Sequence, residues 1–294
     1  MTDARSGVLV TVDELAADLG LTGPDPAAGP PVLLDVRWAL AAAGEPFDGR
    51  AQYLAGHLPG AVFADLEAEL AAEPSPAAGR HPLPSTAQAQ AAARRWGVRT
   101  DSRVVVYDAT GGLAAARAWW VLRYFGVRDV RLLDGGLVAW QRAGHPLEAH
   151  DVVAAPGDVV LHPGHLPVLG AGEAAALASS ADGVLLDARA AERYRGEVEP
   201  VDPRAGHVPG AVSAPTSDNL TGDGTFLDDA ALHARFARLG VQGGVPVGVY
   251  CGSGVTAAHE VAALAAVGID AALYPGSWSQ WSSDPNRPVA TGAQ

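Results

Sequence analysis

The chain has 294 residues, 48% of them apolar, and this length allows two globular domains of ordinary size. No apolar run approaches the roughly 20 residues of a membrane-spanning helix, so we expect no membrane partner. The 33 acidic residues outnumber the 20 basic ones and give a net charge of −13, which disfavours binding to a nucleic-acid backbone.

The N-terminal half alternates helical patterns with short apolar runs. Capping-box spacing, a Ser or Thr followed three residues later by Glu or Gln, marks helix starts at Thr11 with Glu14 and at Ser85 with Gln88. Runs rich in β-branched and other apolar residues predict buried strands at residues 32–36, 61–64, 104–107 and 130–133. This alternation predicts an α/β fold, in which helices cover both faces of a mostly parallel sheet.

A segment without a regular period separates the two halves. Residues 144–167 are rich in Pro, Gly, His and Asp and show neither a helical nor a strand pattern. We therefore place an interdomain linker at residues 147–167, between one domain at 1–146 and a second at 168–294.

The C-terminal half returns to the α/β alternation. Apolar runs predict strands at residues 184–186 and 245–250. Asp228 or Asp229 can cap a helix that ends at Leu239, and a further helix is expected at 257–267. The second half thus predicts the same type of domain as the first.

The two halves also repeat each other in sequence. The segment LLDVR at 33–37 recurs as LLDAR at 185–189, and GHLPGAV at 56–62 recurs as GHVPGAV at 206–212. A third match pairs Leu133-Asp134-Gly135-Gly136 and Trp140 with Tyr274-Pro275-Gly276-Ser277 and Trp281. Matches in the same order and at a nearly constant offset indicate two copies of one domain.

A fourth match distinguishes the copies. VVVYDATGG at 104–112 corresponds to VGVYCGSGV at 247–255, so Asp108 stands where the other copy has Cys251, the one cysteine of the chain. A single cysteine forms no internal disulfide and fits a reducing compartment. Residues 1–5 lack the start of a secretory signal, so we expect a cytoplasmic protein.

Cys251 begins a glycine-rich loop between a predicted strand and a predicted helix. Backbone N–H groups in such a loop can converge on one point, and the helix start adds partial positive charge. Both effects favour a reactive thiolate. The alternative is a buried cysteine that acts as a small apolar side chain; its position in a Gly-x-Gly loop favours the nucleophile.

Several chemistries lack a residue that they require. A cysteine phosphatase needs an arginine six positions after the nucleophile, where this chain has Ala257. Cys-x-x-Cys exchange needs a second cysteine, and a metal site at Cys251 lacks recognisable histidine spacing. All basic residues are arginines, which excludes a catalytic lysine or a lysine-bound pyridoxal phosphate. A thiolate that carries sulfur as a persulfide needs one cysteine and a ring of donors, without metal or cofactor.

These motifs together resemble the tandem-domain rhodanese-type sulfurtransferases. The paired Gly-His-x-Pro-Gly-Ala segments, the cysteine loop and Gly276-Ser277-Trp278 carry the resemblance, which runs from about Val8 to Val289. The resemblance implies two α/β/α domains with the active site in the cleft between them. Thiosulfate-preferring members have basic residues after the cysteine, whereas the 3-mercaptopyruvate sulfurtransferases have Cys-Gly-Ser-Gly-Val-Thr, as here.

The reaction that the resemblance implies is a ping-pong transfer. Cys251 takes sulfur from 3-mercaptopyruvate, pyruvate leaves, and a thiol, thioredoxin or cyanide accepts the sulfur from the persulfide. Three alternatives remain open: a thiosulfate sulfurtransferase using cyanide, a sulfur-relay binding module, and a cysteine phosphatase. No nucleic acid is expected among the partners.

The resemblance also implies roles for individual residues. Arg193 and Arg204 match two arginines that bind the substrate carboxylate, although two extra residues separate this pair. Asp65, His81 and Ser253 match an acid, a histidine and a serine that handle protons near the donor thiol. The remaining substrate-binding positions are the loop residues Gly252, Gly254, Val255 and Thr256. His57 and His207 occur in both copies and are interpreted as structural.

Overall fold

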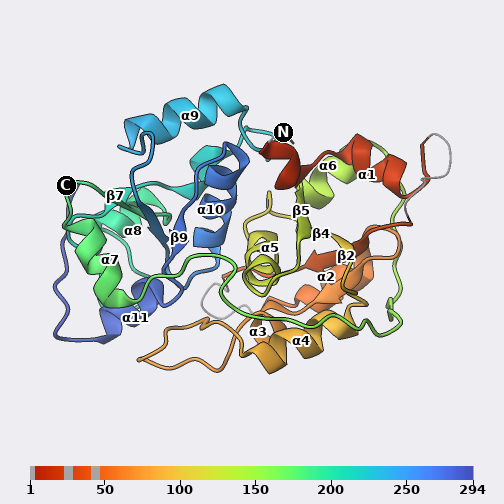
Figure 1. Ribbon diagram of the computed structural model, residues 1–294, viewed down its shortest axis with the longest axis horizontal. Helices are drawn as coiled ribbons and strands as arrows, with labels where there is room; N and C mark the ends of the chain where they lie inside the picture. Colours follow the sequence, from red (N-terminus) through yellow and green to blue (C-terminus); the bar gives the residue numbers. More distant parts are fainter. Residues whose placement is uncertain (1–3, 23–28, 41–46, 294) are drawn as a thin grey trace. The chain divides into compact units, whose positions relative to one another are not determined.

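The computed structural model describes residues 4–22, 29–40 and 47–293, which form two compact units (Figure 1). The first unit comprises Met1–Leu70, Pro84–His165 and Thr221–Phe226. The second comprises Ala71–Leu83, Leu166–Leu220 and Leu227–Gln294. The units therefore interleave along the chain, and residues 71–83 of the N-terminal half pack with the unit that contains Cys251.

The first unit contains a five-stranded sheet. Its strands are β1 (Leu9–Val10), β2 (Val32–Val36), β3 (Val62–Ala64), β4 (Arg103–Tyr107) and β5 (Asp129–Leu133). Its helices are the 3-10 helix η1 (Arg5–Gly7), α1 (Val12–Asp18), α2 (Gly49–Ala55), α3 (Leu66–Glu69), α4 (Thr86–Arg95), α5 (Ala115–Tyr124) and α6 (Gly136–Arg142). Both predicted capping boxes form, at the starts of α1 and α4.

The second unit contains a four-stranded sheet. Its strands are β6 (Val184–Asp187), β7 (Val212–Ser213), β8 (Val247–Tyr250) and β9 (Ala272–Leu273). Its helices are α7 (Ala171–Ala178), α8 (Ala191–Arg195), the 3-10 helix η2 (Thr216–Asn219), α9 (Asp229–Arg238), α10 (Thr256–Ala266) and α11 (Ser277–Ser283). Asp228 caps α9, and β8 begins two residues later than predicted because Pro246 has no N–H for a strand ladder.

Four strands of the first sheet have the same order as the four strands of the second. The strand order is β1-β5-β4-β2-β3 in the first unit and β7-β6-β8-β9 in the second, and every pair is parallel. The order β3-β2-β4-β5 therefore corresponds to β7-β6-β8-β9. The predicted α/β class with parallel sheets is confirmed, and β8 is a central strand whose carboxyl end leads into the Cys251 loop.

Side-chain contacts repeat along with the strands. Tyr194 donates its hydroxyl to the Ala211 carbonyl at 2.7 Å, as Tyr53 does to Ala61 at 2.8 Å. His207 stacks on Tyr194, with ring centroids 3.7 Å apart, and its Nδ1 lies 2.7 Å from the Tyr194 carbonyl oxygen. His57 makes the equivalent contacts with Tyr53. These histidines hold the turn before β3 or β7 and lie in the core of each unit.

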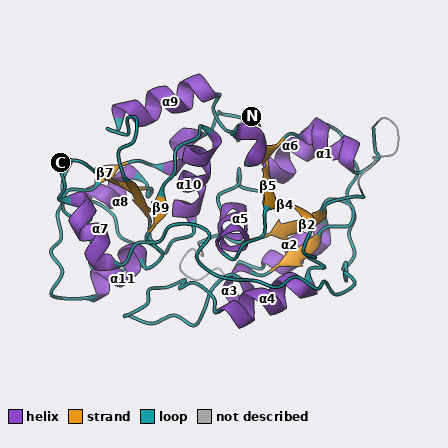
Figure 2. Cartoon of the chain, viewed as in Figure 1, coloured by secondary structure: helices purple, strands orange, loops and turns teal. Residues whose placement is uncertain are grey.

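Apolar cores cover both sheets. In the second unit Leu185, Tyr250, Trp278 and Trp281 are buried on the face that α7, α8 and α11 cover, while α10 packs on β8 from the other face. Residues 143–170 contain no helix or extended strand (Figure 2). Within the described residues, no helix has the length and apolar character needed to cross a membrane.

Candidate active site

Cys251 lies directly after β8 and is buried, with 1% of its surface exposed. The Gly254 N–H donates a hydrogen bond to its Sγ at 3.1 Å. The Cys251 N–H donates to Ser277 Oγ at 3.1 Å, and the Cys251 carbonyl accepts from the Trp278 N–H at 3.0 Å. The loop therefore holds the sulfur against a backbone donor, and Cys251 itself is bonded through its N–H and its carbonyl to the start of α11.

The equivalent loop of the first unit already surrounds an anion. The Asp108 carboxylate accepts four backbone N–H bonds at 2.7–2.9 Å, from Thr110, Gly112, Ala114 and Ala115. This arrangement is a nest of backbone donors at the carboxyl end of a parallel strand. The repeat thus shows a loop at this position whose backbone N–H groups converge on an acceptor side chain, and in the second unit the sulfur of Cys251 occupies the equivalent position.

Two arginines lie beside this sulfur-bearing loop. A Cβ placed on Gly252 would meet Arg80 Nη2 at 3.1 Å and Arg193 Nη1 at 3.4 Å. Asp202 joins the two side chains, because one carboxylate oxygen accepts from Arg80 at 2.6 Å and the other from Arg193 at 3.2 Å. Arg193 also donates to Glu199 at 2.7 Å. Sequence reasoning found Arg193 and missed Arg80.

Burial dominates the electrostatics of this arginine pair. Burial raises the pKa of Asp202 above its ordinary value, although Arg80 and then Arg193 oppose the shift. Tyr250 is the last residue of β8, directly before Cys251. Burial and then the nearby Asp187 carboxylate raise the pKa of its hydroxyl well above 10. Tyr250 is therefore a neutral structural group, whose oxygen accepts the Val208 N–H at 3.1 Å.

The structure brings two of the predicted proton-handling residues together. His81 Nδ1 lies 2.7 Å from Ser253 Oγ, and both side chains are buried. His81 belongs to the segment 71–83, which packs within the second unit. Asp65 belongs to the first unit, where its carboxylate caps α3 by accepting from the Glu67 and Ala68 N–H groups. A part for Asp65 in the reaction stays a prediction.

The other predicted arginine is engaged in a different way. All three guanidinium nitrogens of Arg204 donate to backbone carbonyls at the end of α11 and just beyond, at 2.6–3.0 Å from Ser282, Arg287, Trp281 and Asp284. This arrangement satisfies the carbonyls that a helix end leaves free. The geometry therefore indicates a helix-capping role for Arg204, and its contact with substrate stays a prediction.

The last two predicted loop residues lie where the helix begins. Val255 is the N-cap of α10 and is buried, and Thr256 is the first residue of that helix. Neither side chain is needed to explain the hydrogen bond to Cys251 Sγ, because its donor is the backbone N–H of Gly254.

Gly254 is required at its position for two reasons. Its φ of +78° is unfavourable for other residues, and an added Cβ would lie 2.7 Å from the Pro275 carbonyl oxygen. We expect Gly254→Ala to destabilise the protein by more than about 1–3 kcal/mol and to lower kcat by displacing the N–H that contacts Sγ. Urea unfolding and steady-state kinetics measure both effects.

The matched control is Gly244→Ala. Gly244 has a similar φ of +83° but open space around its Cβ position. Gly244→Ala should have the same free-energy cost of placing alanine at a positive φ and should leave kcat unchanged. Equal losses in the two variants would contradict a specific role for the close approach to Pro275.

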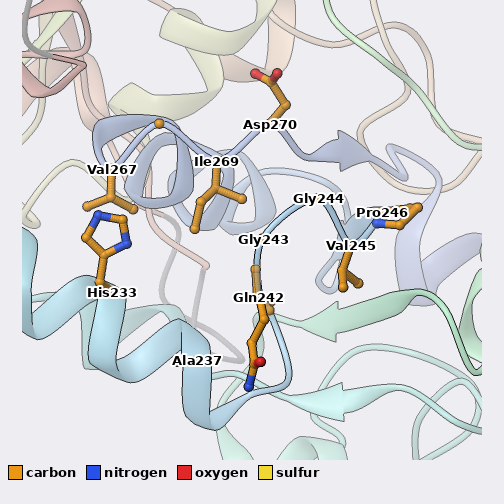
Figure 3. A pocket seen from close by; sticks show the side chains of 12 residues that line it. His233, Ala237, Gln242, Gly243, Gly244, Val245, Pro246, Val267, Ile269 and Asp270 are labelled. Atoms are coloured by element: carbon orange, nitrogen blue, oxygen red, sulfur yellow. The ribbon is translucent and has the colours of Figure 1, made fainter.

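A separate cavity of about 790 Å³ lies at the other end of β8 (Figure 3). Its lining includes Gly243–Pro246 before β8 and Val267–Asp270 after α10, with His233 on α9. The predicted site residues are not part of this lining. In parallel α/β sheets, ligands bind at the carboxyl ends of the strands, where Cys251 lies.

Comparison with known proteins agrees with this architecture. The model of the rhodanese-like domain matches residues 11–143 and again residues 171–284. These matches cover most of the chain and contain every strand of the two sheets except β1. The chain therefore belongs to the rhodanese-like family, as a tandem of two such domains, and the predicted family is confirmed.

Individual relatives carry sulfurtransferase names. SseB of Mycobacterium tuberculosis, provisionally named a thiosulfate sulfurtransferase, is 52% identical over 98% of this chain and 99% of its own length. A Pseudomonas aeruginosa protein, provisionally named a 3-mercaptopyruvate sulfurtransferase, is 47% identical over 98% of this chain and 99% of its own length. The crystal structure of SseA, a 3-mercaptopyruvate sulfurtransferase from Escherichia coli, has a TM-score of 0.77 and 36% identity over 92% of this chain and 98% of that one.

Proposed function

We propose that this chain is a 3-mercaptopyruvate sulfurtransferase that carries sulfur on Cys251 as a persulfide. The observation that carries the proposal is the group of donors at Cys251: a backbone N–H on the sulfur, with two arginine guanidiniums beside the loop. Such a site offers a nucleophile and a binding position for an anionic donor. The single cysteine fits a reducing compartment, and we propose the cytoplasm.

The first half-reaction transfers sulfur to the enzyme. The Cys251 thiolate attacks the sulfur of 3-mercaptopyruvate, an S–S bond forms, and the C–S bond breaks. The electron pair of that bond passes to carbon and gives the enolate of pyruvate. The proton of the donor thiol ends on the methyl carbon of pyruvate, so atoms and charge balance. Backbone N–H groups of the loop stabilise the persulfide anion that remains.

The Ser253 and His81 pair can move this proton. A hydroxyl 2.7 Å from an imidazole nitrogen can exchange protons with it. Ser253 is two residues from the nucleophile, so its hydroxyl belongs to the same loop. We assign the pair to removal of the donor thiol proton and its delivery to the enolate.

The second half-reaction regenerates the thiolate. A thiol, reduced thioredoxin or cyanide attacks the outer sulfur of the persulfide and leaves with it, and the S–S electron pair returns to Cys251. Small acceptors need only reach the outer sulfur, so we propose a small thiol as the general acceptor and thioredoxin or cyanide as alternatives.

The charge of the arginine pair favours a singly charged donor. Arg80 and Arg193 are matched by the carboxylates of Asp202 and Glu199, with which they form ion pairs. This group therefore lacks a large excess of positive charge. A monocarboxylate can bind through the remaining N–H donors, whereas the dianion thiosulfate gains less there because it needs more neutralisation.

Donor kinetics test this proposal. We expect kcat/KM for 3-mercaptopyruvate to exceed that for thiosulfate by more than about tenfold, which corresponds to one charge-assisted hydrogen bond. Pyruvate and the sulfurated acceptor are measured with each donor against a common thiol. A higher kcat/KM for thiosulfate would assign the chain to the thiosulfate enzymes, and release of phosphate from an aryl phosphate would assign it to the phosphatases.

A further inference from the structure

Arg80 belongs to a segment that is fixed to the second unit next to the Cys251 loop. Its backbone N–H donates to Ser279 Oγ at 3.0 Å, on helix α11. Gly79 lies so close to this helix that an added Cβ would be 2.6 Å from the Gly276 carbonyl oxygen. Gln280 donates to the Ala77 carbonyl from the same helix. The position of Arg80 is therefore set by contacts that Ala77, Gly79 and Arg80 itself make with the start of α11.

Both arginines keep unused donors at the site. Asp202 and Glu199 accept from Arg80 Nη1 and from Arg193 Nη2. Arg80 Nε and Arg193 Nε are buried, and neither has a hydrogen-bond partner among the described residues. A buried N–H without an acceptor costs free energy, so each guanidinium keeps a donor that the described residues leave unsatisfied.

One outer nitrogen of each guanidinium lies next to Gly252. Arg80 Nη2 and Arg193 Nη1, which donate no bond within the described residues, are the atoms nearest to the Cβ position of Gly252. Only a residue without a side chain leaves this space open. Two guanidinium groups that meet beside the nucleophile match the two oxygens of a carboxylate.

We infer that Arg80 and Arg193 together bind the carboxylate of the α-keto acid donor, with Asp202 positioning both guanidinium groups. The inference rests on the proposed donor chemistry at Cys251 and adds a second arginine from a segment remote in sequence. Arg80 takes the part that the sequence assigned to Arg204, which is engaged at the end of α11.

The kinetics of arginine variants with two sulfur donors test the inference. The variants are Arg80→Gln, Arg193→Gln as the comparison within the pair, and Arg195→Gln as the control on the same helix, where Arg195 pairs with exposed Glu197. The donors are 3-mercaptopyruvate and mercaptoacetone, in which a methyl group replaces the carboxylate. We expect Arg80→Gln to raise KM for 3-mercaptopyruvate by about 10- to 100-fold, with kcat little changed.

Mercaptoacetone separates binding from structure. Its KM should be the same for wild type and Arg80→Gln, because it has no carboxylate to lose. Arg80→Lys keeps the positive charge but lacks the planar pair of guanidinium donors. Its KM for 3-mercaptopyruvate should lie between those of wild type and Arg80→Gln. Equal KM increases for the two donors, or no increase with either, would overturn the inference and make Arg80 a structural residue.

Direct binding distinguishes failure of the inference from failure of the proposed function. Pyruvate is titrated calorimetrically into Cys251→Ser and into the Cys251→Ser/Arg80→Gln double variant. Weaker binding to the double variant supports the Arg80 site, even if wild type releases no pyruvate from 3-mercaptopyruvate and the proposed function fails. Equal or absent binding in both variants overturns the inference while turnover by wild type still upholds the function.

Discussion

Replacement of Cys251 by aspartate is expected to abolish sulfur transfer and to leave the protein folded with nearly its original stability. The other copy supplies the reason, because Asp108 at the equivalent position accepts four backbone N–H bonds at 2.7–2.9 Å. A carboxylate in the Cys251 loop can use the same type of donors, so the free energy of unfolding should change by no more than about 1 kcal/mol.

The loss of activity follows from the loss of the sulfur nucleophile. Cys251→Asp and Cys251→Ser should both lower kcat for 3-mercaptopyruvate by more than about a thousandfold. Pyruvate release measures the activity, and urea unfolding measures the stability. Residual turnover close to that of wild type in either variant would contradict the persulfide mechanism. A large loss of stability in Cys251→Asp alone would contradict the equivalence of the two loops.

The second large effect is expected from Arg189, a buried arginine just after β6. Arg189 donates to the Asp187 carboxylate at 2.6–3.2 Å and to the Gly206 carbonyl at 2.7 Å. Its guanidinium also lies 4.7 Å from the Trp278 ring centroid. Burial alone would lower the pKa of Arg189, but the Asp187 carboxylate holds that pKa above its ordinary value.

Arg189→Met should therefore destabilise the second unit by about 3–5 kcal/mol, because it leaves the Asp187 carboxylate buried without its cation. Scanning calorimetry measures the shift of the unfolding transition. Arg37→Met is the matched variant in the first unit, where Arg37 contacts Asp35 and the Gly56 carbonyl in the same way. The two variants should show similar losses, and a normal transition temperature for Arg189→Met would contradict the buried ion pair.

Local patterns in the sequence predicted most of the fold. The central strands, the capping boxes at Thr11 and Ser85 and the helix after Cys251 all depend on residues close together in the chain. The repeat then predicted two domains of one kind, and the shared order of four strands in the two sheets agrees with it. Short elements such as β1 and β9, with two residues each, carry too little pattern to be predicted.

The arginine site could not be read from local patterns. Arg80 lies 113 positions before Arg193, and only the packing of the segment 71–83 with the second unit brings them together. Arg204 was the candidate because it matches an arginine of the resembled family, and its bonds to four carbonyls depend on tertiary packing that the sequence does not show. The position of Arg80 next to the predicted His81 was the one available signal.

The first half-reaction offers the most direct test of the persulfide on Cys251. Wild-type protein is mixed with 3-mercaptopyruvate in the absence of an acceptor, and the pyruvate released and the mass of the intact chain are measured. The mechanism predicts one pyruvate per chain and a mass gain of one sulfur atom, located on the peptide that contains Cys251 and removed by a thiol. Pyruvate release without this added sulfur, or equal release by Cys251→Ser, would contradict it.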